Sequence, residues 1–182
     1  MRELSLHILD IAENSIRAGA KNVAITITED PAQDLLCIEV DDDGCGMSEE
    51  DQRLALDPFY TTKTVRRVGL GLPLLAQAAQ RAGGTFRLLS TKGKGTRVTA
   101  TFGLSHIDRQ PLGDMVGTMV SLIAGNPEAD FVYTHAYGGR HFTLDTREIR
   151  ANIDEVPINH PDILHFIREH IEEGLKEIGS AA

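Results

Sequence analysis

A run of apolar residues that ends in an acidic turn with two glycines constrains this fold more than any other feature. Residues 35–40, Leu-Leu-Cys-Ile-Glu-Val, predict a β-strand, and the turn 42–47, Asp-Asp-Gly-Cys-Gly-Met, follows it. Glycines one residue apart allow unusual backbone angles and let a ligand come close to the main chain. Acidic side chains before the turn can accept hydrogen bonds from a ligand. Alone, the pattern also fits an acidic turn after an edge strand, and Glu49 replaces the third glycine of a dinucleotide-binding motif.

Composition narrows the class of protein. The chain has 182 residues, enough for one domain, or one domain with an appendage, around a sizeable core. Its formal net charge is -9 and no basic run exceeds Arg66-Arg67, which argues against binding to a nucleic-acid backbone. Its two cysteines suggest reduced thiols. Because no apolar segment resembles a signal peptide or approaches the ~18 residues of a membrane helix, we expect a soluble cytoplasmic protein that binds neither nucleic acid nor a membrane.

The first helix is predicted over residues 4–18, where apolar residues recur at helical spacing. The opposite stripe is polar and consists of Glu3, His7, Asp10, Asn14 and Arg17. This stripe is either a solvated face or the wall of a pocket. In a pocket, Asn14 could offer an amide oxygen to Mg²⁺ and Arg17 could meet a phosphate. Asp10 could take a proton from a nucleophile, and His7 would form part of the pocket wall.

Strands and helices follow one another through the rest of the first hundred residues. Strands are predicted over 23–28, 35–40, 85–90 and 96–102, and helices over 49–56 and 73–81. This order is typical of an α+β fold, a two-layer α/β sandwich. The loop between the two later helices closes on Gly69-Leu70-Gly71-Leu72. Such a turn into a helix N-terminus is either an anion site, because free N–H groups and the helix dipole face a ligand, or an ordinary exposed loop.

Four segments in this order, residues 10–14, 42–47, 58–63 and 69–72, with Thr96 behind them, resemble the GHKL superfamily of ATP-binding domains. This superfamily includes gyrase, the heat-shock chaperones, sensor histidine kinases, anti-sigma serine kinases and mismatch-repair ATPases. From residue 58 onward the chain looks like a histidine-kinase catalytic domain, whereas its first helix looks like that of a mismatch-repair ATPase. The resemblance implies a Bergerat ATP-binding fold over residues 1–103, with ATP and Mg²⁺ as cofactors.

The resemblance also implies roles for individual residues. Asn14 would bind Mg²⁺, and Asp42 would accept a hydrogen bond from the adenine amino group. Asp10 occupies the position of the general base, where relatives keep a longer glutamate. Lys63 would reach phosphate, and Thr96 would help to hold adenine. The full set of residues implied to contact ATP is Asn14, Arg17, Asp42, Gly44, Gly46, Met47, Phe59, Thr62, Lys63, Arg66, Gly69, Leu70, Gly71, Leu72 and Thr96.

Three departures from the family pattern bear on a kinase function. Arg67 replaces the first glycine of the usual Gly-x-Gly-Leu-Gly-Leu motif, which predicts a short, stiff lid. Ala18 stands where kinases often place an aromatic ring beside the nucleotide. No helix pair with a phosphoacceptor histidine precedes the domain, so we expect a stand-alone protein.

The final segment, residues 104–182, shows no resemblance to the superfamily. Helices are predicted over 112–124, 146–153 and 163–178, and a hairpin that turns at Gly138-Gly139 is predicted over 131–143. We expect a small C-terminal α/β appendage that packs on the sheet of the ATP-binding domain, or alternatively a dimer or partner surface. His135 and His141 can face each other across the hairpin, but a metal site there would lack a visible third ligand.

These features together predict a Mg-ATP-binding regulatory protein that transfers the γ-phosphoryl group of ATP to a separate protein, as histidine or serine kinases do. Phosphoryl transfer needs mainly positioning and charge neutralisation, which the four segments can supply. Two alternatives remain open: a switch that binds a partner when ATP is bound and turns nothing over, and a slow ATPase. The protein partner or phosphoacceptor is not identified by the sequence, and a homodimer is compatible with it.

Overall fold

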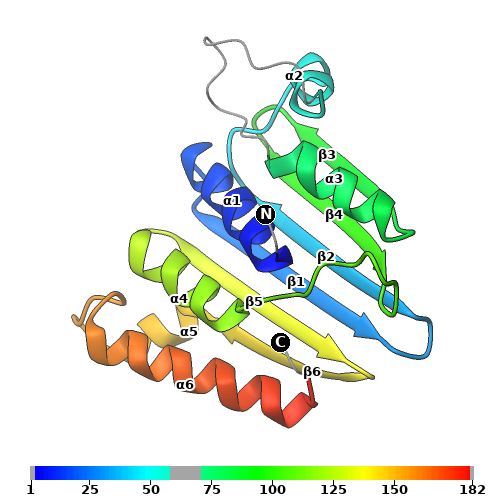
Figure 1. Cartoon of the computed structure of the whole chain (residues 1–182). Helices are drawn as coiled ribbons and strands as arrows, with labels where there is room; N and C mark the ends of the chain where they lie inside the picture. The colour runs from blue at the N-terminus through cyan, green and yellow to red at the C-terminus, as the bar shows by residue number, and fades with distance from the viewer. Residues whose placement is uncertain (1–2, 58–70, 181–182) are drawn as a thin grey trace.

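The structure, a computed structural model, describes residues 3–57 and 71–180. One layer is a six-stranded mixed sheet in the order β3-β4-β2-β1-β5-β6, and helices α1, α3, α4 and α6 lie on one face of it (Figure 1). The elements are α1 (Leu4–Arg17), β1 (Asn22–Asp30), β2 (Leu35–Asp42), α2 (Glu49–Ala55), α3 (Gly71–Arg81), β3 (Phe86–Thr91), β4 (Gly95–Gly103), α4 (Met115–Gly125), β5 (Asp130–Tyr137), β6 (Arg140–Asp145), α5 (Thr146–Arg150) and α6 (Pro161–Ile178). The predicted two-layer α+β fold is therefore confirmed.

Alternation along the strands explains why, among residues 3–57 and 71–180, the helices of the core pack on one face of the sheet. In β2 the buried residues Leu36, Ile38 and Val40 alternate with partly exposed ones, and β1 and β4 follow the same rule. The buried set packs against α1, whose Leu4 and Ile8 are fully buried. The polar side chains on the other face include the ion pair between Arg97 and Asp41. The hydrophobic core thus lies between the sheet and the helices.

Strand pairing extends the elements beyond their predicted ends. Strand β1 begins at Asn22 and ends at Asp30 because it pairs antiparallel with β2 on one side and parallel with β5 on the other. Helix α3 begins at Gly71, two residues earlier than predicted. Helix α4 begins only at Met115, where the side chain of Asp114 accepts a hydrogen bond from the Gly117 N–H (2.7 Å) and caps the helix.

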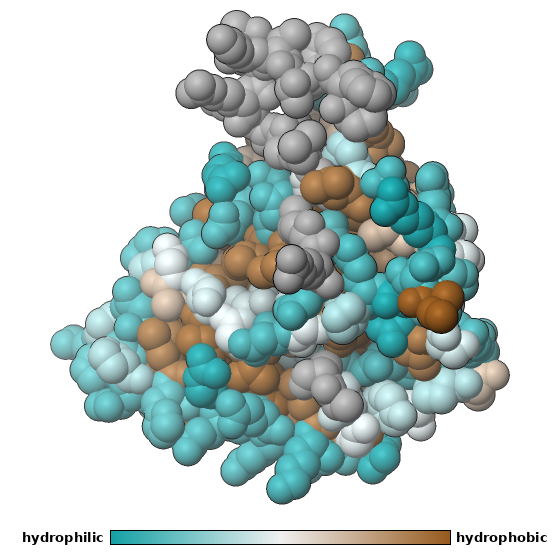
Figure 2. All heavy atoms as spheres, viewed as in Figure 1, coloured by the Kyte–Doolittle hydropathy of each residue, from teal (hydrophilic) through white to brown (hydrophobic). Residues whose placement is uncertain are grey.

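Residues 130–145 add two strands to the same sheet. The predicted hairpin is present: Tyr137 pairs with Arg140 across Gly138 and Gly139, whose φ angles are +55° and +86°. Helices α4 and α6 cover this part of the sheet, and α6 turns Ile167, Ile171 and Leu175 inward. Hydrophilic side chains dominate the lower surface in Figure 2, where α6 lies. Within residues 3–57 and 71–180, no helix is long and apolar enough to cross a membrane.

The expectation that His135 faces His141 is wrong. His135 lies opposite Phe142 and His141 opposite Ala136, so the two histidines point to opposite faces of the sheet. His135 is fully buried, its Nδ1 lying 2.7 Å from the Tyr133 hydroxyl and its Nε2 2.8 Å from Glu29 Oε1. No group of three or more His, Cys, Asp or Glu residues that could hold a metal occurs in the described part of the chain.

Glu29 anchors a buried polar network that joins β1, β5 and the end of α6. The Ser180 hydroxyl donates to its Oε1 (2.7 Å), as the His135 ring can from Nε2. Burial acts to raise the pKa of Glu29, but the hydrogen bonds from His135 and Ser180 outweigh it and hold the pKa below its usual value of 4.5. A depressed carboxyl pKa contributes stability above the unfolded pKa, and that stability is lost as the pH falls through the folded pKa.

We therefore expect Glu29→Gln to lower the free energy of unfolding by about 1 kcal/mol at pH 7, because it removes the charge from these hydrogen bonds. The difference from wild type should shrink as the pH falls from 4.5, the usual pKa, through the lower pKa of the folded state, where the wild-type carboxylate is protonated. Urea denaturation across this pH range measures it, with the exposed Glu173→Gln as the matched control. An equal destabilisation at every pH would show that the charge of Glu29 is not responsible.

Candidate functional site

The glycine turn after β2 is fixed against the C-terminal end of α1. The Cys45 N–H donates to the carbonyl oxygen of Ala18 (2.9 Å), and a Cβ added at Gly44 would lie 3.2 Å from the Ala18 Cβ. Gly46 has a φ of +63°, and a side chain there would overlap the carbonyl group of Thr91. Close packing on two sides explains why both positions are glycine.

Asp42 is the carboxylate at this turn that is best positioned to accept a hydrogen bond from a ligand. It is the last residue of β2 and lies between Val23 of β1 and Thr96 of β4. Its Oδ2 accepts a hydrogen bond from the Ser15 hydroxyl (2.6 Å), and its Oδ1 accepts one from the Gly44 N–H (2.9 Å). Because a carboxylate can accept about four hydrogen bonds, the orientation of Asp42 is fixed while acceptor capacity remains for a ligand.

The neighbouring Asp43 has a different task. It accepts hydrogen bonds from the backbone N–H groups of Lys21 and Asn22 (2.7 and 2.9 Å) and from the Asn22 side chain (2.7 Å). Desolvation acts to raise its pKa, but these hydrogen bonds, above all those from Asn22, lower it below the usual value. Asp43 therefore fastens the start of β1, and Asp42 is the carboxylate that faces the helices.

Ser90 connects the turn to the sheet, a role that our sequence analysis missed. Its hydroxyl accepts from the Met47 N–H (2.8 Å), donates to the carbonyl oxygen of Gly95 (3.0 Å) and lies 2.9 Å from Thr96 Oγ1. The Gln52 side chain donates to the Ser90 carbonyl oxygen (2.9 Å). The alternation of β3 could have indicated this role, because Ser90 is a polar residue on the same inward-facing side of the strand as the partly buried Phe86 and Leu88. The structure thus brings Met47 and Thr96 together.

Asp10, Asn14 and Arg17 lie on the predicted stripe of α1. Arg17 Nη1 donates to Asn14 Oδ1 (3.0 Å), and its Nη2 forms an ion pair with Glu13 (2.8 Å). The Asp10 carboxylate faces Gly71, the first residue of α3, so closely that a Cβ at that position would overlap it. Glycine at position 71 therefore allows the N-terminus of α3 to approach Asp10, where the helix dipole favours a negative charge.

Three buried polar atoms along this stripe have no hydrogen-bond partner: His7 Nδ1, Asp10 Oδ2 and Asn14 Nδ2. They are the full set of such side-chain atoms in the described part of the chain. Buried polar groups are nearly always hydrogen-bonded, so unpaired ones at a single place require an explanation. A ligand or water that binds along α1 would satisfy all three.

The other predicted nucleotide contacts are located less fully. Leu72 follows Gly71 in α3, and its side chain is buried in the core. Six of the predicted residues lie outside the described residues: Phe59, Thr62, Lys63, Arg66, Gly69 and Leu70.

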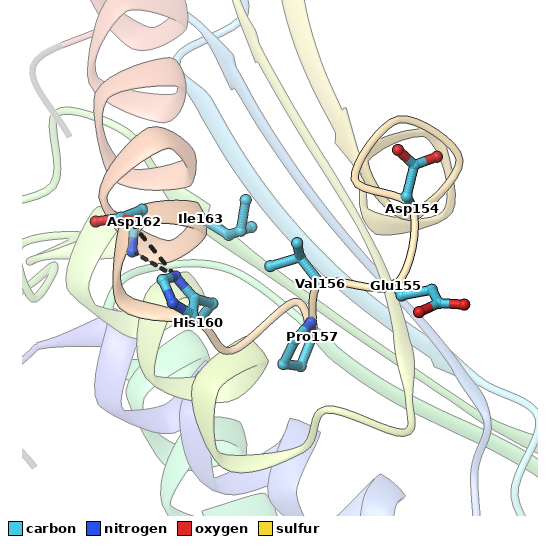
Figure 3. Close-up of a pocket in the computed structure, with 7 residues that line it drawn as sticks. All are labelled: Asp154, Glu155, Val156, Pro157, His160, Asp162 and Ile163. Carbon is cyan, nitrogen blue, oxygen red and sulfur yellow. Dashed lines mark hydrogen bonds and ion pairs between the residues drawn. The ribbon is translucent and has the colours of Figure 1, made fainter.

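A separate hollow lies between the loop that follows α5 and the first turn of α6 (Figure 3). Val156 and Ile163 approach each other in it, whereas the carboxylates of Asp154 and Glu155 point away. The backbone N–H of Asp162 donates to His160 Nδ1 (3.3 Å) at its edge. None of its lining residues belongs to the predicted ATP site.

Comparison with known proteins extends these observations. Residues 2–106 match the profile of the family described as histidine kinase-, DNA gyrase B-, and HSP90-like ATPase. A "non-motile and phage-resistance protein" of Caulobacter vibrioides is 32% identical over 118 residues, which are 60% of this chain and 14% of that protein. The DNA mismatch repair protein MutL of Lactococcus lactis subsp. lactis is 28% identical over 187 residues, 95% of this chain and 27% of MutL. The chain thus spans less than a third of the length of either relative.

A solved structure shows a similar arrangement of elements. The MutL ATPase domain of Aquifex aeolicus, complexed with ADP, aligns with a TM-score of 0.50 and 18% sequence identity. The alignment covers 80% of this chain and 63% of that one. This likeness shows the fold, an open mixed sheet with helices packed on it.

Proposed function

Because the chain belongs to the histidine kinase-, DNA gyrase B-, and HSP90-like ATPase family, we propose that it binds Mg-ATP beside α1 and transfers the γ-phosphoryl group to a separate protein. One observation carries this proposal. A carboxylate held by Ser15 and Gly44 stands at one end of a stripe whose three buried polar atoms have no partner. This arrangement fits a ligand that has a hydrogen-bond donor at one end, for Asp42, and both donors and acceptors along its length, for the unpaired atoms of α1.

The adenine base would bind at Asp42. Its carboxylate would accept a hydrogen bond from the amino group of adenine. The hydrogen bonds from Ser15 and Gly44 hold the carboxylate in place for this contact. Thr96 lies beside Asp42 in the sheet, and Met47 is fixed nearby through Ser90. Gly44 and Gly46 keep the turn narrow enough to leave the base room.

The residues on α1 fit a magnesium ion. Mg²⁺ usually takes one or two protein oxygens and completes its shell with phosphate oxygens and water. Asn14 would offer its amide oxygen to the ion, and Asp10, one helical turn before it, stays available as the base. Asn14 Oδ1 is hydrogen-bonded to Arg17, whose side chain is 60% exposed and can swing from Asn14 to a phosphate. When bound, the ion would neutralise charge on the phosphates.

The phosphates would lie between α1 and the N-terminus of α3. Gly71 keeps this helix end close to Asp10, and helix N-termini favour phosphate. Lys63, Arg66 and Gly69 complete this proposal, as the family resemblance implies. Asp10 would take the proton of the attacking group as the new bond to phosphorus forms, the bond from phosphorus to the β–γ bridging oxygen breaks and ADP leaves.

Ser15→Ala tests whether the hydrogen bond from Ser15 orients the Asp42 carboxylate for ATP binding. Removing the hydroxyl leaves Asp42 Oδ2 without its donor, so the carboxylate is less firmly oriented towards adenine. We expect the dissociation constant for ATP to rise about fivefold, the value of one hydrogen bond of about 1 kcal/mol. Isothermal calorimetry measures the change, and the exposed Ser121→Ala of α4 is the control. Equal affinities for wild type and Ser15→Ala would remove Ser15 from the binding site.

The transfer reaction is tested with γ-labelled Mg-ATP. The purified protein is incubated alone and with a lysate of the organism that encodes it, and free phosphate and labelled protein are followed. Label on a second protein in the lysate supports the proposal. Free phosphate without labelled protein in either sample indicates an ATPase instead.

A second function is favoured by how the C-terminal segment holds α1. The backbone N–H groups of Leu4 and Ser5 donate to the carbonyl oxygens of Pro111 and Leu112 (3.0 and 2.7 Å). A shift of α1 on binding ATP would therefore reach α4 and the connector between β4 and α4, residues 104–114. This coupling suits a switch that binds a protein partner only with ATP. Intact ATP in both incubations, with a partner retained only when ATP is present, would favour the switch over the kinase.

A further inference from the structure

Among the described strands, β6 pairs only with β5 and so forms one edge of the sheet. The two-residue turn before β6 closes with a hydrogen bond from the Arg140 N–H to the carbonyl oxygen of Tyr137. Hydrogen-bonded and non-hydrogen-bonded pairs then alternate along the antiparallel ladder. The backbone N–H and C=O groups of His141, Thr143 and Asp145 therefore point away from β5. In the described part of the chain, none of these N–H groups donates a hydrogen bond to another segment.

Strand β6 lacks the bulges, prolines and lysines that often keep edge strands from pairing with another chain. Its ladder with β5 runs from Arg140 to Asp145 with one residue opposite one, and the strand contains neither proline nor lysine. Helix α5, which follows β6, turns back towards β5, where Thr146 Oγ1 accepts a hydrogen bond from the Phe131 N–H (2.9 Å). A further strand can therefore pair along β6.

Exposed apolar side chains lie beside this edge. Helix α6 packs on β6, and the Phe142 ring meets the His170 ring edge to face, with centroids 5.2 Å apart. Phe166 stacks on His170 with centroids 5.7 Å apart and is 52% exposed. Val156, in the hollow at the first turn of α6, is 43% exposed (Figure 3). Exposed apolar surface next to an unpaired strand is typical of an interaction surface.

We propose that two copies of this chain form a dimer in which β6 pairs antiparallel with β6 of the second copy, about a two-fold axis at Thr143. The three outward residues are centred on Thr143, so this register puts Thr143 opposite itself and His141 opposite Asp145. The His141 ring can donate a hydrogen bond to the facing carboxylate. Asp145 already pairs with Arg147 of its own chain (2.7 Å), but a carboxylate can accept about four hydrogen bonds. This self-complementarity favours a second copy over an unrelated strand.

The two-fold axis is perpendicular to the sheet, so the helices of both copies lie on the same face of one continuous sheet. The two α6 helices would then lie side by side and cover Phe166. Strand β6 is separated from β2, which carries Asp42, by β1 and β5. The dimer therefore leaves the proposed ATP site open, and this inference does not depend on the proposed function.

Sedimentation equilibrium of the full chain over a wide range of concentrations tests the dimer. Thr143→Pro removes the N–H at the two-fold axis from both copies and spares the ladder with β5, so it should weaken association at least about tenfold. Thr143→Val keeps this N–H and the β-branched shape, and its dissociation constant should stay within about twofold of wild type. A monomeric wild type at every concentration, or a Thr143→Pro dimer as tight as wild type, would overturn the inference.

Hydrogen exchange of the wild-type protein gives a second test that does not require Thr143→Pro to fold. The amides of His141, Thr143 and Asp145 should exchange at least about tenfold more slowly in the dimer than in the diluted monomer. The amides of Phe142 and Leu144 face β5, so they should be protected in both states and serve as the internal control. Fast exchange of the three outward amides in the dimer would place the interface elsewhere and contradict the inference.

Discussion

Replacing Asp10 with asparagine is expected to lower the rate at which the γ-phosphate leaves ATP by about 10²- to 10⁴-fold. The amide has nearly the same volume as the carboxylate but cannot take a proton from an attacking group. Its surroundings should tolerate the change, because Asp10 Oδ2 accepts no hydrogen bond within the protein. Single-turnover reactions with γ-labelled ATP, counting free phosphate and labelled protein together, measure the rate.

The affinity for ATP should change little in Asp10→Asn, because the adenine contact at Asp42 is untouched. Asp108→Asn, which removes an exposed carboxylate from the connector, is the control and should react like wild type. Phosphate loss at the wild-type rate in Asp10→Asn would show that another group, or none, acts as the base.

Asp42→Asn is expected to weaken ATP binding about 10- to 100-fold, which corresponds to a charge-assisted hydrogen bond of about 1.5–3 kcal/mol. The oxygen of the new amide can still accept from the Gly44 N–H. Its NH₂ group would then face the Ser15 hydroxyl and the amino group of adenine, where donors meet donors. Calorimetric titration with ATP measures the loss.

Two neighbouring acids provide controls for Asp42→Asn. Asp41 points to the uncovered face of the sheet and pairs with Arg97, so Asp41→Asn should leave ATP affinity unchanged. Asp43→Asn should lower the stability of the fold, because Asp43 holds the start of β1. It should weaken ATP binding less than Asp42→Asn does. If Asp41→Asn and Asp42→Asn weakened ATP binding equally, the effect would come from lost charge and not from a specific contact.

Much of the secondary structure could be predicted because it is determined by patterns within short segments of the sequence. Strand alternation in β1 and β2, helical spacing in α1 and the glycines at 138 and 139 each act over a few residues. The stripe of α1 was also visible as a pattern. The sequence pattern did not show whether this stripe faces solvent or a pocket, because the answer depends on how α3 and the connector pack against α1.

The rest depended on contacts between distant segments. Ser15 and Asp42 are 27 residues apart and meet only once α1 packs on β2. The parallel pairing of β5 with β1 leaves no mark in either strand alone. The error at His135 was avoidable, because a two-residue turn at Gly138-Gly139 places position 135 opposite 142 by counting.

The most direct test of this account compares ATP with GTP by isothermal calorimetry, with and without Mg²⁺. Adenine presents an amino donor to the Asp42 carboxylate, whereas guanine presents a carbonyl oxygen at the corresponding place, which the carboxylate would repel. The account predicts one ATP bound per chain, tighter binding with Mg²⁺, and GTP binding at least about tenfold weaker. Equal affinity for the two nucleotides, or no binding of ATP, would contradict it.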